Sequence, residues 1–232
     1  MLRPAAEVSQ GDWLLRYSAI EPLVVESYVS AGFPAYARVL NPANGFDGAA
    51  VRWSVIAQEI GVELTAQTQW SDLAAEFQDE DELINLDAPD WSPDPAVARA
   101  LTSVLRSHTG SAQDCYFLIW EGYASVSDYV FGLDAPKVAV SQHRSLFLLN
   151  GSLQDACEPF IENDGRLPNW WWPATQEWCV GNDMYARSSF VDMYARSSFV
   201  GGSQECIDAV LSQPELEALP ISPYSRVYEG LN

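Results

Sequence analysis

Residues 183–191 have the sequence Asp-Met-Tyr-Ala-Arg-Ser-Ser-Phe-Val, and residues 192–200 repeat it without a single change. Repeat folds such as solenoids need longer units and at least three copies to bury a core, so this pair indicates an insertion and not a repeat architecture. Side chains alternate between the two faces of a strand, so nine extra residues within a strand would turn every later side chain to the opposite face. We therefore expect one copy to fill a strand position. The other copy is then looped out, extends a strand or hairpin, or forms a swapped strand in an oligomer.

The composition predicts a folded globular protein with a single domain over residues 1–232. Apolar residues make up 48% of the chain, which also contains 9 Trp, 10 Tyr and 9 Phe. Disordered chains have few aromatic residues and low hydrophobicity. A chain of 232 residues is also long enough to bury a substantial core.

The charge is strongly one-sided, with 32 acidic residues against 12 basic ones and a net charge of −20. A surface of this kind repels phosphate groups, which disfavours binding to nucleic acid or to an anionic membrane. Two interpretations remain: the charge simply keeps the protein soluble, or it favours association with a basic protein.

The sequence also predicts a cytoplasmic protein. Its first residues lack the apolar segment of a signal peptide, and no apolar run approaches the roughly 20 residues that a membrane helix needs. The four cysteines are widely spaced and form no Cys-x-x-Cys motif, which predicts reduced and mostly buried thiols. They are Cys115, Cys157, Cys179 and Cys206.

Hydrophobic patterns predict an α+β fold with one mixed or antiparallel sheet and flanking helices. Continuous apolar runs indicate strands that are buried on both faces, at residues 115–120 and 145–149. Asn150-Gly151 indicates a hairpin turn after the second of these. Shorter strands are expected at residues 36–40 and 178–180.

Helical spacing and capping residues predict four helices. Asp94 is expected to cap the third helix, with Pro95 at its first position, and Ser203 is expected to cap the last. The acidic and proline-rich residues 78–95 are expected to form a loop. The helices are expected at residues 51–60, 70–77, 95–108 and 203–211, and Val55 is expected on the apolar side of the first.

The candidate binding site is a group of tryptophans. On an extended chain Trp170 and Trp172 face one way and Trp171 faces the other, so the three rings cannot enter one core. One interpretation is a core layer with two faces. The other is a pocket or interface in which at least one ring is accessible, because Trp is favoured at binding hot spots. Trp178, Trp120 and Glu121 complete this candidate pocket.

Two other groups of residues are candidates for chemistry. Gly201, Gly202 and Ser203 open the last helix, where backbone N–H groups could hold an anion, although ordinary capping explains the same residues. His108 and His143 are the only histidines, and their spacing indicates no metal site, although a Cys-His or Ser-His nucleophile remains an alternative. The sequence contains no phosphate-binding glycine motif, and no cofactor is expected.

Five short motifs stand out, at residues 32–40, 51–53, 171–180, 200–203 and 216–220. Together they resemble an uncharacterised family of hypothetical proteins from high-GC Gram-positive bacteria. The resemblance covers most of the chain in the same order, and removing one nine-residue copy makes residues 178–201 resemble an ordinary member. The resemblance implies no activity and no site residues. In the family pattern a histidine commonly follows the first motif, where this chain has Asn41, which weakens any metal or acid–base role there.

These features favour a non-enzymatic cytoplasmic protein that binds a basic partner, in the manner of an immunity protein or antitoxin. The alternative is a small-molecule-binding protein or hydrolase, in which the tryptophan pocket holds the ligand and Glu121 or a histidine is the base. A third hypothesis is that the repeat itself carries no function.

Overall fold

The predicted strands assemble into one nine-stranded antiparallel sheet, which confirms the α+β fold. The computed structural model describes residues 2–15, 24–45, 47–76, 86, 93–122, 134–141, 144–158, 166–182 and 196–227. The strand order is β1-β7-β5-β8-β9-β10-β2-β11, and β6 pairs with the same edge of β7 as β1 does. The strands are β1 Arg3–Pro4, β2 Ala35–Leu40, β5 Cys115–Trp120, β6 Lys137–Ser141, β7 Arg144–Gly151, β8 Trp170–Pro173, β9 Cys179–Asn182, β10 Ser197–Gly202 and β11 Ala218–Pro220.

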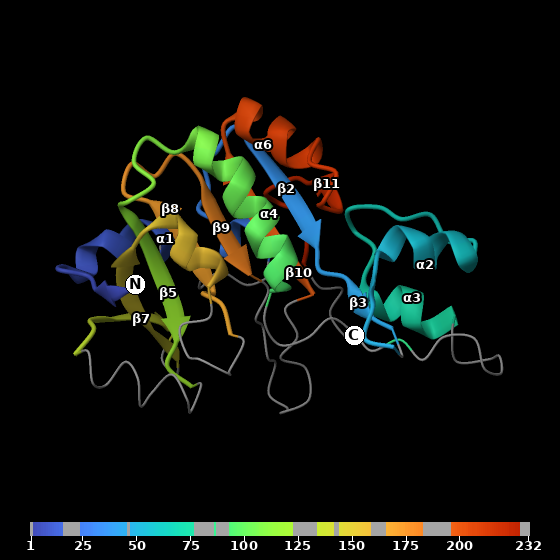
Figure 1. The fold of residues 1–232 in the computed structure, drawn as a ribbon, viewed down its shortest axis with the longest axis horizontal. Coiled ribbons are helices and arrows are strands. Elements are labelled where there is room, and N and C mark those ends of the chain that lie inside the picture. Colours follow the sequence, from blue (N-terminus) through green and yellow to red (C-terminus); the bar gives the residue numbers. More distant parts are fainter. Residues whose placement is uncertain are drawn as a thin grey trace.

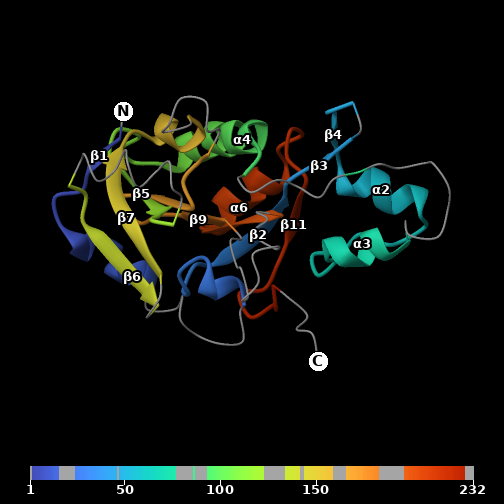
Figure 2. The same ribbon diagram turned by 90° about the horizontal axis from the view of Figure 1, so that it is seen from below.

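Two helices cover one face of this sheet, and the N-terminal segments cover the other (Figures 1 and 2). The helices are α4 (Pro95–Leu105) and α6 (Gln204–Leu211), which pack Leu101, Ile207 and Val210 against the sheet. The opposite face is covered by Leu14, Tyr28 and their neighbours. The short N-terminal helices are η1 Val8–Gly11, α1 Asp12–Leu15 and η2 Val25–Ser27, and two further 3-10 turns are η3 Arg106–His108 and η4 Leu153–Cys157.

Burial on both faces explains why β5 and β8 are apolar without alternation. In β5, Phe117 packs with α4 and α6 while Leu118 packs with the N-terminal segments. In β8, Trp171 faces the helices, whereas Trp170 and Trp172 face the other way. A central antiparallel strand with two covered faces requires this continuous apolar pattern.

A separate small core lies at one end of the molecule, where α2 and α3 extend beyond the sheet (Figures 1 and 2). It contains Trp53, Ile56, Trp70 and Leu73, and it joins the sheet through Leu40. Its elements are β3 Ala43–Asn44, β4 Ala50–Val51, α2 Trp53–Glu59 and α3 Trp70–Glu76.

Capping interactions largely follow the sequence prediction. Asp94 accepts hydrogen bonds from the N–H groups of Ala96 (2.7 Å) and Val97 (3.1 Å), and Pro95 is the first helical residue of α4. Ser203 caps α6 by accepting from Cys206 N at 3.2 Å. These contacts satisfy backbone donors that have no partner within the helix.

Two local predictions were wrong. Asn150 and Gly151 do not form a hairpin turn, because β7 continues through them and pairs them with Tyr116 and Cys115. Val55 was expected on the buried side of α2, but it is 47% exposed and Trp53 is buried in its place. The predicted loop at residues 78–95 lies mostly outside the described residues.

The second nine-residue copy supplies β10, in which Ser197–Gly202 lie between β2 and β9. Residues 183–195, which include the whole first copy, lie outside the described residues. β9 ends at Asn182 and β10 begins at Ser197, so the repeat interrupts neither of these two strands. The alternation in β10 is therefore intact: Phe199 packs with the N-terminal segments and Val200 packs with the helices.

The residue after each copy explains why the second one suits this strand. Gly201 follows the second copy, and a Cβ atom at this position would lie 2.5 Å from Cδ2 of Phe33. The first copy is followed by Asp192, whose side chain would meet the Phe33 ring. In the other arrangement, the first copy fills β10 and Gly201 keeps its place. Residues 192–200 would then have to loop out between Val191 and Gly201, in the middle of a strand that is paired on both sides.

Candidate functional site

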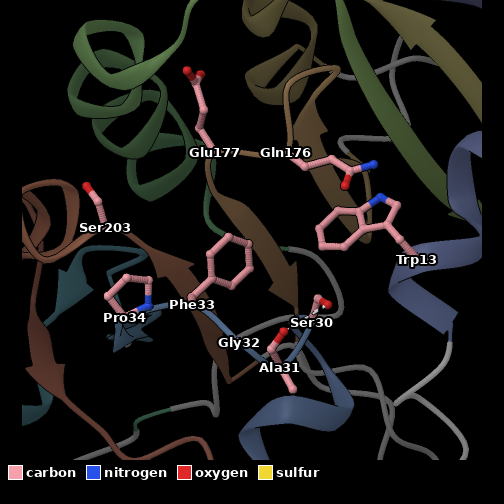
Figure 3. Close-up of a pocket in the computed structure, with 9 residues that line it drawn as sticks. All are labelled: Trp13, Ser30, Ala31, Gly32, Phe33, Pro34, Gln176, Glu177 and Ser203. Carbon is pink, nitrogen blue, oxygen red and sulfur yellow. Dashed lines mark hydrogen bonds between the residues drawn. The ribbon is translucent and has the colours of Figure 1, made fainter.

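Four distant segments of the chain form a cleft beside the sheet, with a volume of about 350 Å³. Trp13 comes from α1, Phe33 precedes β2, Gln176 lies in the turn between β8 and β9, and Ser203 caps α6 (Figure 3). The remaining lining residues are Ser30, Ala31, Gly32, Pro34 and Glu177.

Two aromatic rings line the cleft in fixed positions. The Trp13 and Phe33 rings meet edge to face, with centroids 6.3 Å apart. Behind them, Trp13 packs against Trp172 at 5.8 Å, and Tyr116 stacks on Trp172 at 6.0 Å. Edge-to-face and stacked pairs of this kind contribute beyond their buried area, so the rings form a rigid wall.

A buried tyrosine fixes the segment that carries Phe33. The hydroxyl of Tyr36 accepts a hydrogen bond from Phe33 N at 3.0 Å and donates one to the carbonyl of Ser30 at 3.1 Å. Gly32, between them, has φ +99°, which a residue with a side chain rarely adopts. Burial raises the pKa of the Tyr36 hydroxyl, so it stays protonated as this donor.

The opposite wall carries polar groups. Figure 3 shows the Gln176 side chain pointing toward Trp13, whereas the Glu177 side chain points away from both rings. The Glu177 carboxylate accepts from Gly110 N at 3.0 Å and from the Thr175 hydroxyl at 2.8 Å. Glu177 therefore fixes the turn that presents Gln176.

Gln176 is strained, with φ 56° in the left-handed region. Such strain in a residue other than glycine costs of order 1 kcal/mol and often occurs at functional sites. We expect Gln176→Gly to raise the free energy of unfolding by about 1 kcal/mol in denaturant titrations. Gln176→Ala is the control, because it removes the side chain without relieving the backbone. Equal stability of the Gly and Ala variants would contradict this account.

The structure does not gather the predicted tryptophans around a cavity among the described residues. Trp171, Trp172 and Trp178 are fully buried and Trp170 is 6% exposed, so the core interpretation describes their placement and the expected accessible ring is absent. The rings avoid a single crowded core by entering two cores on opposite faces of the sheet. Trp120 is half-buried and packs against both cores.

Glu121 and the glycines before α6 have structural contacts. Glu121 forms an ion pair with Lys137 at 2.8 Å on the surface. A Cβ atom on Gly202 would lie 3.3 Å from the Cys206 sulfur. Gly201 makes room for Phe33 and Ser203 caps the helix, so ordinary packing and capping account for the predicted anion site. Only Ser203 of these residues lines the cleft.

All four cysteines are free thiols, and their burial makes them poor nucleophiles. Burial raises the pKa of Cys115 to about 12 and that of Cys206 to about 11, which keeps both protonated at neutral pH. His108 ends η3, and His143 lies outside the described residues. In the described part of the chain, no three His, Cys, Asp or Glu side chains form a group that could hold a metal ion.

We expect the native protein to react slowly with a disulfide reagent such as 5,5′-dithiobis(2-nitrobenzoate) at pH 8, because the thiols are buried and protonated. Four thiols should react at once after unfolding in guanidinium chloride. Fast reaction of any thiol in the native protein would show that at least one cysteine is accessible.

The sequence did not predict the cleft. The available signal was that Trp13 and Phe33 are aromatic residues outside the predicted strands.

No helix in the described residues combines the length and apolar character needed to cross a membrane. Comparisons with protein-family models, with curated proteins and with solved structures found no match to this chain.

Proposed function

We propose that this is a non-enzymatic cytoplasmic binding protein that associates with a basic protein, as immunity proteins and antitoxins do. The observation that carries the proposal is the net charge of −20. A charge of this size attracts a basic partner over long distances and speeds association. It also repels nucleic acid and anionic membranes.

The described surface carries the same imbalance. Thirteen described acidic residues are exposed against six basic ones, so the exposed part of the described surface is acidic. The exposed bases are Arg3, Arg52, Arg99, Arg106, Lys137 and Arg226. The exposed acids are Glu7, Asp12, Asp47, Glu59, Glu63, Asp72, Asp114, Asp134, Glu158, Glu177, Glu205, Asp208 and Glu215.

The cleft adds aromatic side chains that can anchor a partner, which charge alone does not provide. Aromatic side chains supply much of the affinity at protein interfaces, whereas exposed charges mainly govern the association rate and partner choice. Trp13 and Phe33 are half-buried side chains held in place by neighbours, so they can anchor a partner with little loss of conformational freedom.

Affinity capture from a lysate of the source cells, at low and at high salt, tests the proposal. We expect one basic protein to be retained in stoichiometric amount at low salt and released at high salt. An unrelated bait of similar size and net charge is the control, because it captures whatever binds any polyanion. Absence of a protein specific to this chain at either salt would contradict the proposal.

The cleft also supports a second candidate, a protein that binds a small molecule. Its volume is at the lower end of the range for ligand pockets, which suits a ligand of about the size of one amino acid. In that case capture would find no protein partner, and small-molecule binding would depend on Trp13 and Phe33. The buried cysteines give no support to hydrolysis by a cysteine nucleophile.

A further inference from the structure

The cleft contains a buried hydrogen-bond donor without an acceptor. Nε1 of Trp13 is shielded from solvent and meets no hydrogen-bond partner among the described residues. Nearly all buried donors in folded proteins are paired, so an unpaired one calls for an explanation. The side chain that points toward it is Gln176, which is exposed and strained (Figure 3). A ligand that displaces this carboxamide would bring its own acceptor to the indole N–H.

Contacts within the protein hold the walls of the cleft in place without a ligand. The Tyr36 hydroxyl fixes the backbone between Ser30 and Phe33, and Glu177 fixes the turn that carries Gln176. The Trp13 ring rests on Phe33 and on the buried Trp172. Because these positions are set by contacts within the protein, binding needs only the movement of one exposed side chain.

The net charge of the protein favours some hydrogen-bond acceptors for the Trp13 N–H over others. A carboxylate or phosphate would be repelled by a protein of net charge −20. A peptide carbonyl is a neutral acceptor, and a cationic side chain next to it would be attracted by the same charge. The faces of Trp and Phe also attract Arg and Lys side chains.

We propose that the cleft binds an extended segment of the basic partner. A main-chain carbonyl of that segment accepts the hydrogen bond from Trp13 Nε1, and the adjacent Arg or Lys side chain lies across the Trp13 and Phe33 rings. The volume of about 350 Å³ limits the cleft to about one residue of the segment. This inference rests on the proposed function and names the contact through which it works.

The test uses three simple probes and the full chain labelled with ¹⁵N. N-acetyl-L-arginine N-methylamide has both carbonyls and the cation, agmatine has the cation alone, and N-acetyl-L-glutamate N-methylamide has the carbonyls with an opposite charge. Formation of the hydrogen bond is followed by the indole ¹H–¹⁵N signal of Trp13, which is assigned by its loss in Trp13→Phe. The dissociation constants of the wild type and of each variant are taken from the backbone amide signals of the cleft residues Gly32 and Gln176, which all of these proteins retain.

The arginine diamide is expected to move the Trp13 indole proton downfield in the millimolar range, as a new hydrogen bond forms, and agmatine is not. Trp13→Phe keeps an aromatic ring but removes the donor, so it should weaken binding about fivefold or more. Trp120→Phe is the matched control: Trp120 is also half-buried but does not line the cleft, so binding should be unchanged.

Three results would overturn the inference: no shift of the Trp13 signal with up to 50 mM arginine diamide, equal binding by wild type and Trp13→Phe, or an equal shift with the glutamate diamide. Each of them leaves the proposed function standing if a basic protein is still captured in a salt-dependent manner.

Discussion

Replacing Phe199 with alanine is expected to lower the free energy of unfolding by about 3–5 kcal/mol, the range for a large buried aromatic side chain. Phe199 is 1% exposed in β10, and its ring centroid lies 5.3 Å from that of Tyr28. The same change at Phe190, its counterpart in the first copy, is expected to change stability by less than about 0.5 kcal/mol, because the second copy supplies the strand.

This pair of variants answers a question that a deletion cannot. Deleting residues 183–191 or residues 192–200 leaves the same sequence, so deletion does not reveal which copy is used. Equilibrium unfolding in urea of both single variants and of the double variant separates the cases. If the losses in unfolding free energy of the two single variants add up to that of the double variant, and Phe199→Ala accounts for nearly all of it, only the second copy fills β10.

If either copy could occupy β10, the three variants would show a different pattern of stability losses. If the first copy could replace the second, both single variants would lose little stability and the double variant would lose much more. Gly201 opposes that exchange, because Asp192 would take its place beside the Phe33 ring. The hydrogen bonds of Ser197 to Arg38 (2.9 Å) and of Ser198 to Asn182 (2.7 Å) do not distinguish the copies, since both copies carry the same serines.

Replacing Arg38 with alanine is expected to cost about 3–4 kcal/mol of unfolding free energy, because it removes several buried hydrogen bonds at once. Arg38 is 4% exposed, and one of its terminal nitrogens donates to the carbonyls of Ala66 (2.9 Å) and Thr68 (2.7 Å). Its guanidinium lies 5.5 Å from the Trp53 ring centroid. Arg38 thus joins β2 and β10 to the small core that contains α2 and α3.

Two further arginine variants control for charge. Arg106→Ala removes an exposed guanidinium and should cost less than about 1 kcal/mol. Arg38→Lys keeps the positive charge but not the planar set of N–H donors of the guanidinium. Most of the unfolding free energy lost in Arg38→Ala should therefore also be lost in Arg38→Lys. Hydrogen exchange should increase in α2 and α3 of Arg38→Ala before it increases in β5. Unchanged exchange in α2 and α3 would contradict the proposed link.

Local sequence features predicted the main elements well because their causes are local. Asp94-Pro95 and Ser203 begin helices through hydrogen bonds to residues two or three positions away. The apolar run at residues 115–120 matches β5 because burial on both faces leaves no position for a polar side chain. Asn150-Gly151 failed as a turn signal because the partner strand extends to Cys115 and continues the pairing.

The cleft could not be predicted because it depends on tertiary packing. Trp13, Phe33, Gln176 and Ser203 are separated by up to 190 positions in the sequence and meet only after the sheet forms. The Trp170–Trp172 run attracted attention by its composition, but the two covered faces of the sheet absorb all three rings. The sequence shows that aromatic residues are abundant, and the fold decides which of their rings line a cleft.

The central claim, that charge brings a basic partner to this protein, is tested most directly by the rate of association at different salt concentrations. The partner purified after affinity capture would be mixed with this protein in a stopped-flow instrument between about 20 and 300 mM sodium chloride. The association rate constant is expected to fall at least about tenfold over this range, because salt screens the attraction of unlike charges. A rate constant that does not change with salt would contradict the claim.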